Sequence, residues 1–159
     1  MVGAVKDACD EKSPDTRGCD KEEPTEPPSG DCMVIVYGGY SRIRDYLDSL
    51  KPALYSYNSM IRPTGYYLKP VHKVYYRTTG GRSKVYEYYG RYWWRIEGQG
   101  SRRRLIYVGR EKPPSLPDPP VTGLEGVKLI VDGKDVVLDC TSYKRIEHIL
   151  SGLHVEILE

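Results

Sequence analysis

Three consecutive arginines near the middle of the chain are the residues whose type and spacing best suit a chemical role. Arg102, Arg103 and Arg104 follow Gly98-Gln99-Gly100-Ser101, a sequence that favours a hairpin connection between two strands. Arginine side chains at a hairpin tip extend outward, and a guanidinium can donate two parallel hydrogen bonds to a phosphate or to a guanine edge. The triplet therefore predicts contact with a polyanion, with a solvated turn as the alternative.

Aromatic residues crowd the segment that precedes these arginines. The stretch from Tyr86 to Glu97 holds both tryptophans of the chain, and exposed rings there would stack on unpaired bases. The alternative is core packing, because a chain with 15 Tyr and no Phe must build much of its aromatic core from tyrosine. The residues that we predict to contact nucleic acid are Arg82, Lys84, Arg91, Trp93, Arg95, Arg102, Arg103 and Arg104.

Charge is divided along the chain into three blocks. Residues 1–31 carry 4 Lys/Arg and 9 Asp/Glu, residues 32–120 carry 16 and 6, and residues 121–159 carry 4 and 7. Fourteen of the 15 tyrosines lie in the basic block. A basic block rich in aromatic side chains suits a partner with phosphates and stackable bases, which means DNA or RNA.

The order of these features resembles that of a known class of DNA-binding module. An aromatic strand ending in Trp-Arg, a glycine turn, a basic stretch and Tyr-x-Gly follow one another here at Tyr92 to Arg95, Gly98 to Gly100, Arg102 to Arg104, and Tyr107 with Gly109. This pattern resembles the Tyr/Arg-rich antiparallel modules of archaeal and phage mobile-element proteins, and loosely the three-stranded arm-binding domains of integrases. The resemblance covers residues 86–109 and implies a sheet that faces DNA, without catalysis.

Catalytic and metal-binding patterns are weak. A small metal-dependent nuclease built from Glu87, Glu97 and His72 is a third interpretation, although such enzymes need clustered carboxylates. The cysteines form no Cys-x-x-Cys pair and the histidines complete no zinc pattern, so we expect no metal and no cofactor. Free thiols are the expected state, with a disulfide inside the first 31 residues left open. The four cysteines are Cys9, Cys19, Cys32 and Cys140.

Hydrophobic patterning predicts the elements that position the basic block. The apolar run 33–37 predicts a strand, and apolar residues at helical spacing predict an amphipathic helix over 42–50 that Pro52 ends, followed by a loop over 52–64. Alternation predicts strands over 71–77, 84–97 and 102–108. Period two places one set of side chains on one face of the longest strand, unless a bulge at Gly90 exchanges the faces. That set is Tyr86, Tyr88, Tyr92, Trp94 and Ile96.

The end of the chain predicts a small ββαβ unit. Asp132-Gly133 between two apolar runs signals a hairpin, and a helix over 142–151 and a strand over 154–158 follow it. A unit of this size has too little core to be confidently independent. We therefore expect it to pack on the rest of the chain or on a second copy, as a homodimer.

The predicted fold class is α+β, with an antiparallel β-meander, a short N-terminal helix and the small C-terminal ββαβ unit. We expect a disordered acidic tail over 1–31, a basic aromatic β-rich domain over 32–112, a Pro-rich linker over 113–120 and the acidic unit over 121–159. No run of about 18 apolar residues is present, which excludes a helical membrane span. The N-terminal residues lack the order typical of a secretory signal, so we expect a cytoplasmic protein.

The sequence as a whole predicts a non-enzymatic nucleic-acid-binding protein, with DNA favoured over RNA and phosphate contacts dominant. Asn and Gln occur once each while 29% of residues are charged, a composition typical of hyperthermophiles, so the predicted source is a hyperthermophilic archaeon or its virus or plasmid. The alternative is a protein-interaction or virion-assembly module, because Tyr, Trp and Arg also dominate protein interfaces.

Overall fold

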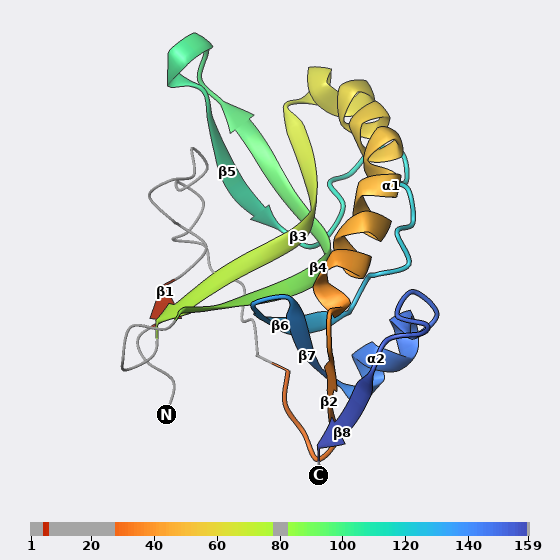
Figure 1. Ribbon diagram of the computed structural model, residues 1–159. Helices are drawn as coiled ribbons and strands as arrows, with labels where there is room; N and C mark the ends of the chain where they lie inside the picture. Colours follow the sequence, from red (N-terminus) through yellow and green to blue (C-terminus); the bar gives the residue numbers. More distant parts are fainter. Residues whose placement is uncertain (1–4, 7–27, 78–82, 159) are drawn as a thin grey trace.

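The computed structural model describes residues 5–6, 28–77 and 83–158 of the chain. Within them, eight strands form one antiparallel sheet in the order β1-β3-β4-β6-β7-β2-β8, and β5 pairs with β4 beside this path (Figure 1). The α+β class and the antiparallel meander are thereby confirmed. The strands are β1 (Val5–Lys6), β2 (Met33–Val36), β3 (Tyr66–Arg77), β4 (Ser83–Glu97), β5 (Arg104–Gly109), β6 (Lys128–Asp132), β7 (Asp135–Asp139) and β8 (Val155–Leu158).

In the described part of the chain, two α-helices accompany the sheet, α1 (Gly39–Ile61) and α2 (Cys140–Ile146), and they lie on the same side of it in Figure 1. The order β6, β7, α2, β8 confirms the predicted ββαβ pattern, although α2 is shorter than expected and turns continue to residue 152. These strands do not form a sheet of their own. β6 pairs with β4, and β2 lies between β7 and β8. The regions 32–112 and 121–159 therefore contribute to one sheet.

Helix α1 corrects the prediction that Pro52 ends a short helix and that residues 52–64 form a loop. The helix continues through Pro52 to Ile61 and is followed by a 3-10 turn, Arg62–Thr64. An interior proline costs about 3 kcal/mol. The second half of α1 buries Leu54, Tyr57 and Ile61, and burial of each such side chain contributes about 1.5–3 kcal/mol. The free energy gained by burying these three side chains therefore outweighs the cost of the interior proline.

The core lies on both faces of the sheet. On the helix side, α1 and α2 pack on the inner strands, and the second half of α1 packs on Leu68 and Trp93. The opposite face carries an aromatic cluster in which Tyr86, Tyr88, Tyr92 and Trp94 meet, so four of the five residues predicted to share a face do so. The remaining members of this aromatic cluster are Val74, Tyr76 and Tyr107, with Tyr67, Leu105 and Ile130 packed against it.

The irregularity expected at Gly90 is present but acts on the neighbouring strand. Register shifts there, because Lys69 pairs with Tyr92 whereas Val71 pairs with Tyr89. The β4 side chains keep their faces across the shift, and β3 changes face instead at Pro70. Val71 packs with the helix-side core, whereas the Lys69 ammonium lies over the Trp94 ring, 4.8 Å from its centroid.

Residues 113–120, predicted as an extended linker, pack along α1 (Figure 1). Leu116 is buried with Trp93, and the Tyr57 hydroxyl donates a hydrogen bond to the Pro117 carbonyl at 2.6 Å. Just beyond, the Tyr46 hydroxyl donates to the Thr122 carbonyl at 2.8 Å. The segment therefore fixes the outer side of the helix.

A disulfide joins Cys32 to Cys140, so the expectation of free thiols is wrong for this pair. The pairing of Met33 with Asp139 brings the two flanking cysteines together, with a Cα–Cα distance of 5.5 Å that suits a disulfide. Cys9 and Cys19 lie outside the described residues, as does most of the predicted acidic tail. None of the described helices has the length and apolarity needed to cross a membrane.

Candidate nucleic-acid interface

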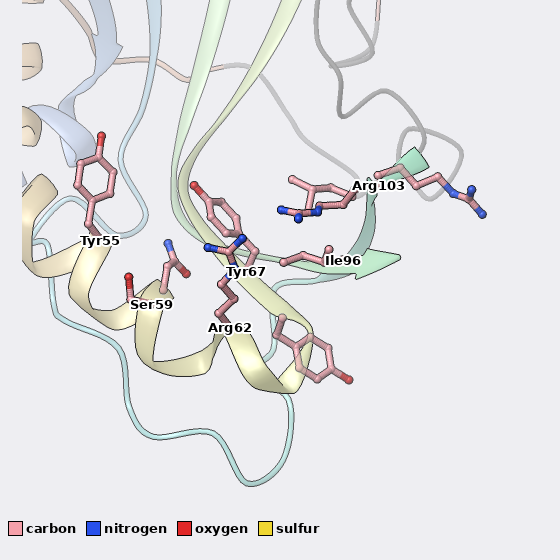
Figure 2. A pocket seen from close by; sticks show the side chains of 10 residues that line it. Tyr55, Ser59, Arg62, Tyr67, Ile96 and Arg103 are labelled. Carbon is pink, nitrogen blue, oxygen red and sulfur yellow. The ribbon is translucent and has the colours of Figure 1, made fainter. Parts of the chain in front are cut away.

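A cleft of about 500 Å³ opens between the end of α1 and the strands β3, β4 and β5. In Figure 2, Tyr55, Ser59 and Arg62 lie on the helix side of it and Tyr67 on the strand side, while the Arg103 side chain extends away from them. We call it the arginine cleft. Its other lining residues are Asn58, Tyr66, Ile96, Arg104 and Leu105.

The helix wall of the arginine cleft exists because α1 continues past Pro52. Tyr55, Ser59 and Arg62 then recur at helical spacing and share one face. Asn58 fixes this face against β3: its Nδ2 donates to the Leu68 carbonyl at 3.0 Å, and the Leu68 amide donates to its Oδ1 at 2.9 Å. The amide of Asn58 thus replaces a neighbouring strand at this edge of the sheet.

The strand wall depends on the turn between β4 and β5, which confirms the predicted hairpin. Gly98 has a φ of 83°, and a Cβ at this position would overlap the carbonyl of Arg102, so the turn requires glycine. A 3-10 turn, Gly100–Arg102, follows and delivers the three arginines to the edge of the arginine cleft. Arg102 and Arg103 are exposed there.

Positive charge exceeds negative charge around the arginine cleft. Glu97 is an acidic residue beside the cleft: its carboxylate accepts a hydrogen bond from Arg95 Nε at 3.0 Å and lies 3.6 Å from an Arg104 guanidinium nitrogen. Arg62, Arg102 and Arg103 form no ion pair with any described residue. The described residues that line the arginine cleft and its adjoining turn therefore include more arginines than carboxylates, which leaves a net positive surface.

Four of the eight predicted contact residues lie at or beside the arginine cleft. Arg103 and Arg104 line the arginine cleft, Arg102 lies in the adjoining turn, and Arg95 is exposed beside Glu97. Lys84 is exposed at the opposite end of β4, and Arg82 lies outside the described residues.

Trp93 and Arg91 do not belong to this surface. Trp93 is 0% exposed and packs edge-on to Tyr57, with ring centroids 6.2 Å apart, so its ring is closed to a base and the prediction is wrong. The indole of Trp93 contributes to the aromatic core of a chain that contains no Phe. Arg91 is half-buried near Tyr57: burial raises the pKa of that phenol, and the Arg91 charge opposes the rise.

Sequence reasoning missed the helix wall of the arginine cleft. Arg62, Tyr55, Tyr66 and Tyr67 were not predicted as contact residues because the helix was expected to end before them. The helical spacing of Tyr55, Ser59 and Arg62 was the available signal, and Pro52 obscured it.

A second hollow, of about 260 Å³, adjoins the arginine cleft and shares Tyr55, Asn58 and Tyr67 with it. We call it the lysine hollow, because Lys51 and Lys73 line it together with Arg44. Both hollows lie between α1 and β3.

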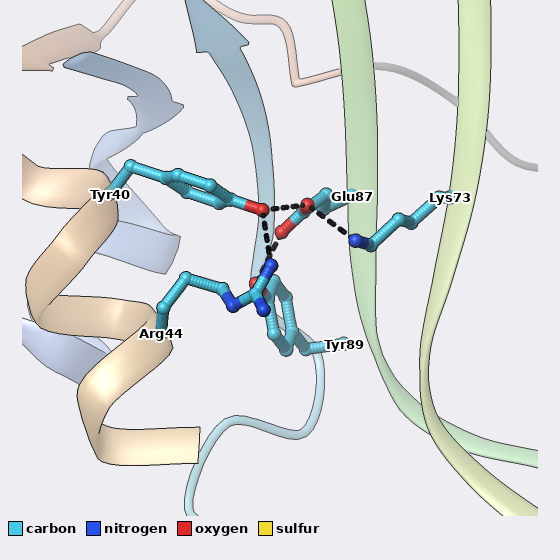
Figure 3. Close-up of polar contacts among 5 residues, drawn as sticks. All are labelled: Tyr40, Arg44, Lys73, Glu87 and Tyr89. Carbon is cyan, nitrogen blue, oxygen red and sulfur yellow. Dashed lines mark hydrogen bonds and ion pairs between the residues drawn. The ribbon is translucent and has the colours of Figure 1, made fainter. Parts of the chain in front are cut away.

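Glu87 lines the lysine hollow and is 1% exposed, and Figure 3 shows its polar contacts. Its carboxylate accepts hydrogen bonds from the hydroxyls of Tyr40, at 2.7 Å, and Tyr89, and it lies 3.6 Å from Lys73 Nζ. A guanidinium nitrogen of Arg44 donates to the Tyr40 hydroxyl at 3.2 Å. Burial raises the pKa of Tyr89, and the Glu87 charge raises it further, so Tyr89 remains a protonated donor at neutral pH.

The three residues of the nuclease interpretation are not brought together. The His72 ring stacks on Tyr92 in the aromatic cluster, with centroids 5.3 Å apart, whereas Glu87 faces α1 on the other side of the sheet. Glu97 lies at the far end of β4 among arginines. Across the described ranges, no three His, Cys, Asp or Glu side chains gather into a metal-binding group.

Comparison of the chain with protein-family models, with curated proteins and with solved structures gives no match.

Proposed function

We propose that the arginine cleft binds nucleic acid, chiefly through phosphates. The observation that carries this proposal is the lining itself, in which Arg62, Arg103 and Arg104 share one concave surface with Tyr55, Tyr66 and Tyr67. Guanidinium groups neutralise phosphates and release counterions, and tyrosine rings offer stacking surfaces to bases. Tyr55, which is 60% exposed, is the most accessible of these rings.

A binding titration of an Arg62→Ala, Arg103→Ala double variant tests the proposal. We expect weaker binding to random oligonucleotides and a shallower salt dependence, with the slope of log K against log salt reduced by about 0.7–0.9 for each lost phosphate contact. Lys144→Ala, an exposed position on α2, is the matched control and should bind as the wild type does. Unchanged affinity and slope in the double variant would contradict the proposal.

We also propose a preferred ligand, a location and a source for the protein, each supported by the sequence. DNA as the preferred ligand follows the resemblance of residues 86–109 to mobile-element modules. A hyperthermophilic archaeal, viral or plasmid source follows the composition, with its single Asn and single Gln, and a cytoplasmic location is part of the same proposal.

A protein-interaction role is the second candidate, and the β8 edge favours it. β8 ends the sheet order, and Ile157 is 61% exposed beside the exposed Leu158. An unpaired edge with apolar side chains is a template for another strand. A second copy could pair there, forming the homodimer expected from the C-terminal unit. Sedimentation of an Ile157→Lys variant tests this, since a dimer of the wild type should become a monomer.

A further inference from the structure

We infer that the arginine cleft and the lysine hollow form one groove along α1 that binds a single-stranded nucleic acid. This inference rests on the proposed function and adds a second subsite and a substrate class to it. The connection is direct, because Tyr55, Asn58 and Tyr67 line both hollows. The groove thus has an aromatic middle with cations on either side.

The lysine hollow supplies the second set of cations. Lys51 is 43% exposed and pairs with Asp48 at 2.9 Å, and Lys73 pairs with the buried Glu87 at 3.6 Å. Arg44 donates a hydrogen bond to the Tyr40 hydroxyl, and its charge also interacts with Asp48 and Glu87. Three cations therefore face two carboxylates, one of which is buried beneath two tyrosine hydroxyls. The mouth of this hollow is positive and suits a phosphate.

The shape of the groove selects a single strand. From Arg44 to Arg62 the helix advances about 27 Å, at 1.5 Å per residue, so phosphates bound at both ends are several nucleotides apart. The tyrosines lie between those ends. A duplex presents only the edges of its bases, in its grooves, whereas a single strand exposes base faces to aromatic rings. A footprint of about four nucleotides or more follows, the lower limit for a single-strand-binding module.

Oligonucleotides of two lengths separate the two subsites. Fluorescence anisotropy would compare oligothymidine of about three nucleotides with oligothymidine of about ten, and with a duplex of about ten base pairs. Lys51→Glu should weaken binding of the longer strand about tenfold and change binding of the shorter strand less than about twofold, because only the longer strand spans both hollows. Oligouridine of the same lengths distinguishes RNA from DNA as the source of the strand.

Two further variants make the result decisive. Arg103→Glu should weaken binding of both lengths, because both occupy the arginine cleft, and Lys144→Glu controls for net charge.

If Arg103→Glu weakens binding and Lys51→Glu weakens binding of neither length, the inference of a continuous groove is wrong while the proposed function stands. If the duplex binds as tightly as the longer strand, the single-strand assignment is overturned. If no oligonucleotide binds the wild type, both proposals fail. A thermal melt of each variant confirms that it folds.

Discussion

Glu87 shows how a single buried carboxylate can hold a helix and two strands together. It accepts hydrogen bonds from Tyr40 on α1 and Tyr89 on β4, and it pairs with Lys73 on β3. A buried carboxylate persists in a fold only when its partners compensate the loss of water. The sequence offered Glu87 as a candidate nuclease residue and not as a buried contact to a helix, because strand periodicity does not reveal which helix packs above it.

We expect Glu87→Gln to lower the free energy of unfolding by about 2 kcal/mol. The amide leaves the Lys73 charge without its counterion and replaces an acceptor with a donor that faces two hydroxyl donors. Urea denaturation of the variant measures the loss. Glu156→Gln is the control, because Glu156 is exposed and accepts a single hydrogen bond from Tyr37. Equal stability of the two variants would show that the buried network contributes no more to stability than one exposed hydrogen bond.

Glu125 provides a pH-dependent contribution to stability. Burial acts to raise the pKa of its carboxyl, but hydrogen bonds from the Thr122 amide at 2.8 Å, the Thr122 hydroxyl at 2.9 Å and the Gly123 amide at 2.9 Å lower it overall below 4.5. A group with a depressed folded-state pKa stabilises the fold above its unfolded pKa. That contribution is lost as the pH falls through the folded pKa.

Glu125→Gln should therefore destabilise the protein by about 1 kcal/mol at pH 7. The difference from the wild type should shrink as the pH falls from about 4.5, because the wild-type carboxyl then becomes protonated. Thermal melts across this range measure it. A constant difference at every pH would mean that shape, rather than charge, explains the effect of the substitution.

At the scale of elements, local patterns predicted strands well and the long helix poorly. Alternating residues and glycine turns identified the β4–β5 hairpin and the β6–β7 hairpin, because their side chains and turns obey local rules. The rule that proline ends a helix failed for α1, because the burial of Tyr57 and Ile61 depends on partners far away in the sequence. Because of that error the helix side of the arginine cleft was not predicted, since Tyr55 and Arg62 lie beyond Pro52.

Replacement of the interior proline tests whether burial overrides a local penalty. Pro52→Ala restores a backbone donor to α1, and we expect it to stabilise the protein by about 1–2 kcal/mol after allowance for the more flexible unfolded chain. Chemical denaturation measures the gain. Pro63→Ala is the control, because Pro63 occupies the first turn of a 3-10 helix, where proline is favoured. A stabilisation of equal size at Pro63 would contradict the argument.

At the scale of the whole molecule, sequence separation says little about which strands meet. The first strand after the acidic block, β2, lies between two strands from the end of the chain. No local pattern encodes this pairing, which is why the C-terminal strands were expected to form their own unit. The division of charge along the chain likewise did not predict which cations line the arginine cleft, because Lys84 and Arg91 lie away from it while Arg62 lines it.

The disulfide between Cys32 and Cys140 should be the largest single covalent contribution to the stability of this sheet. It closes a loop with a sequence separation of 108, and cross-linking a loop of that size stabilises a folded chain by about 4–5 kcal/mol in the chain-entropy model. Cys140→Ser should lower the melting temperature under oxidising conditions, and Cys32→Ser should lower it equally because each removes the same bond. In excess reductant the wild type should melt with the variants. A wild-type melting temperature that does not respond to reductant would show that the two thiols are not joined in solution, and β2 would then be held between β7 and β8 by backbone pairing alone.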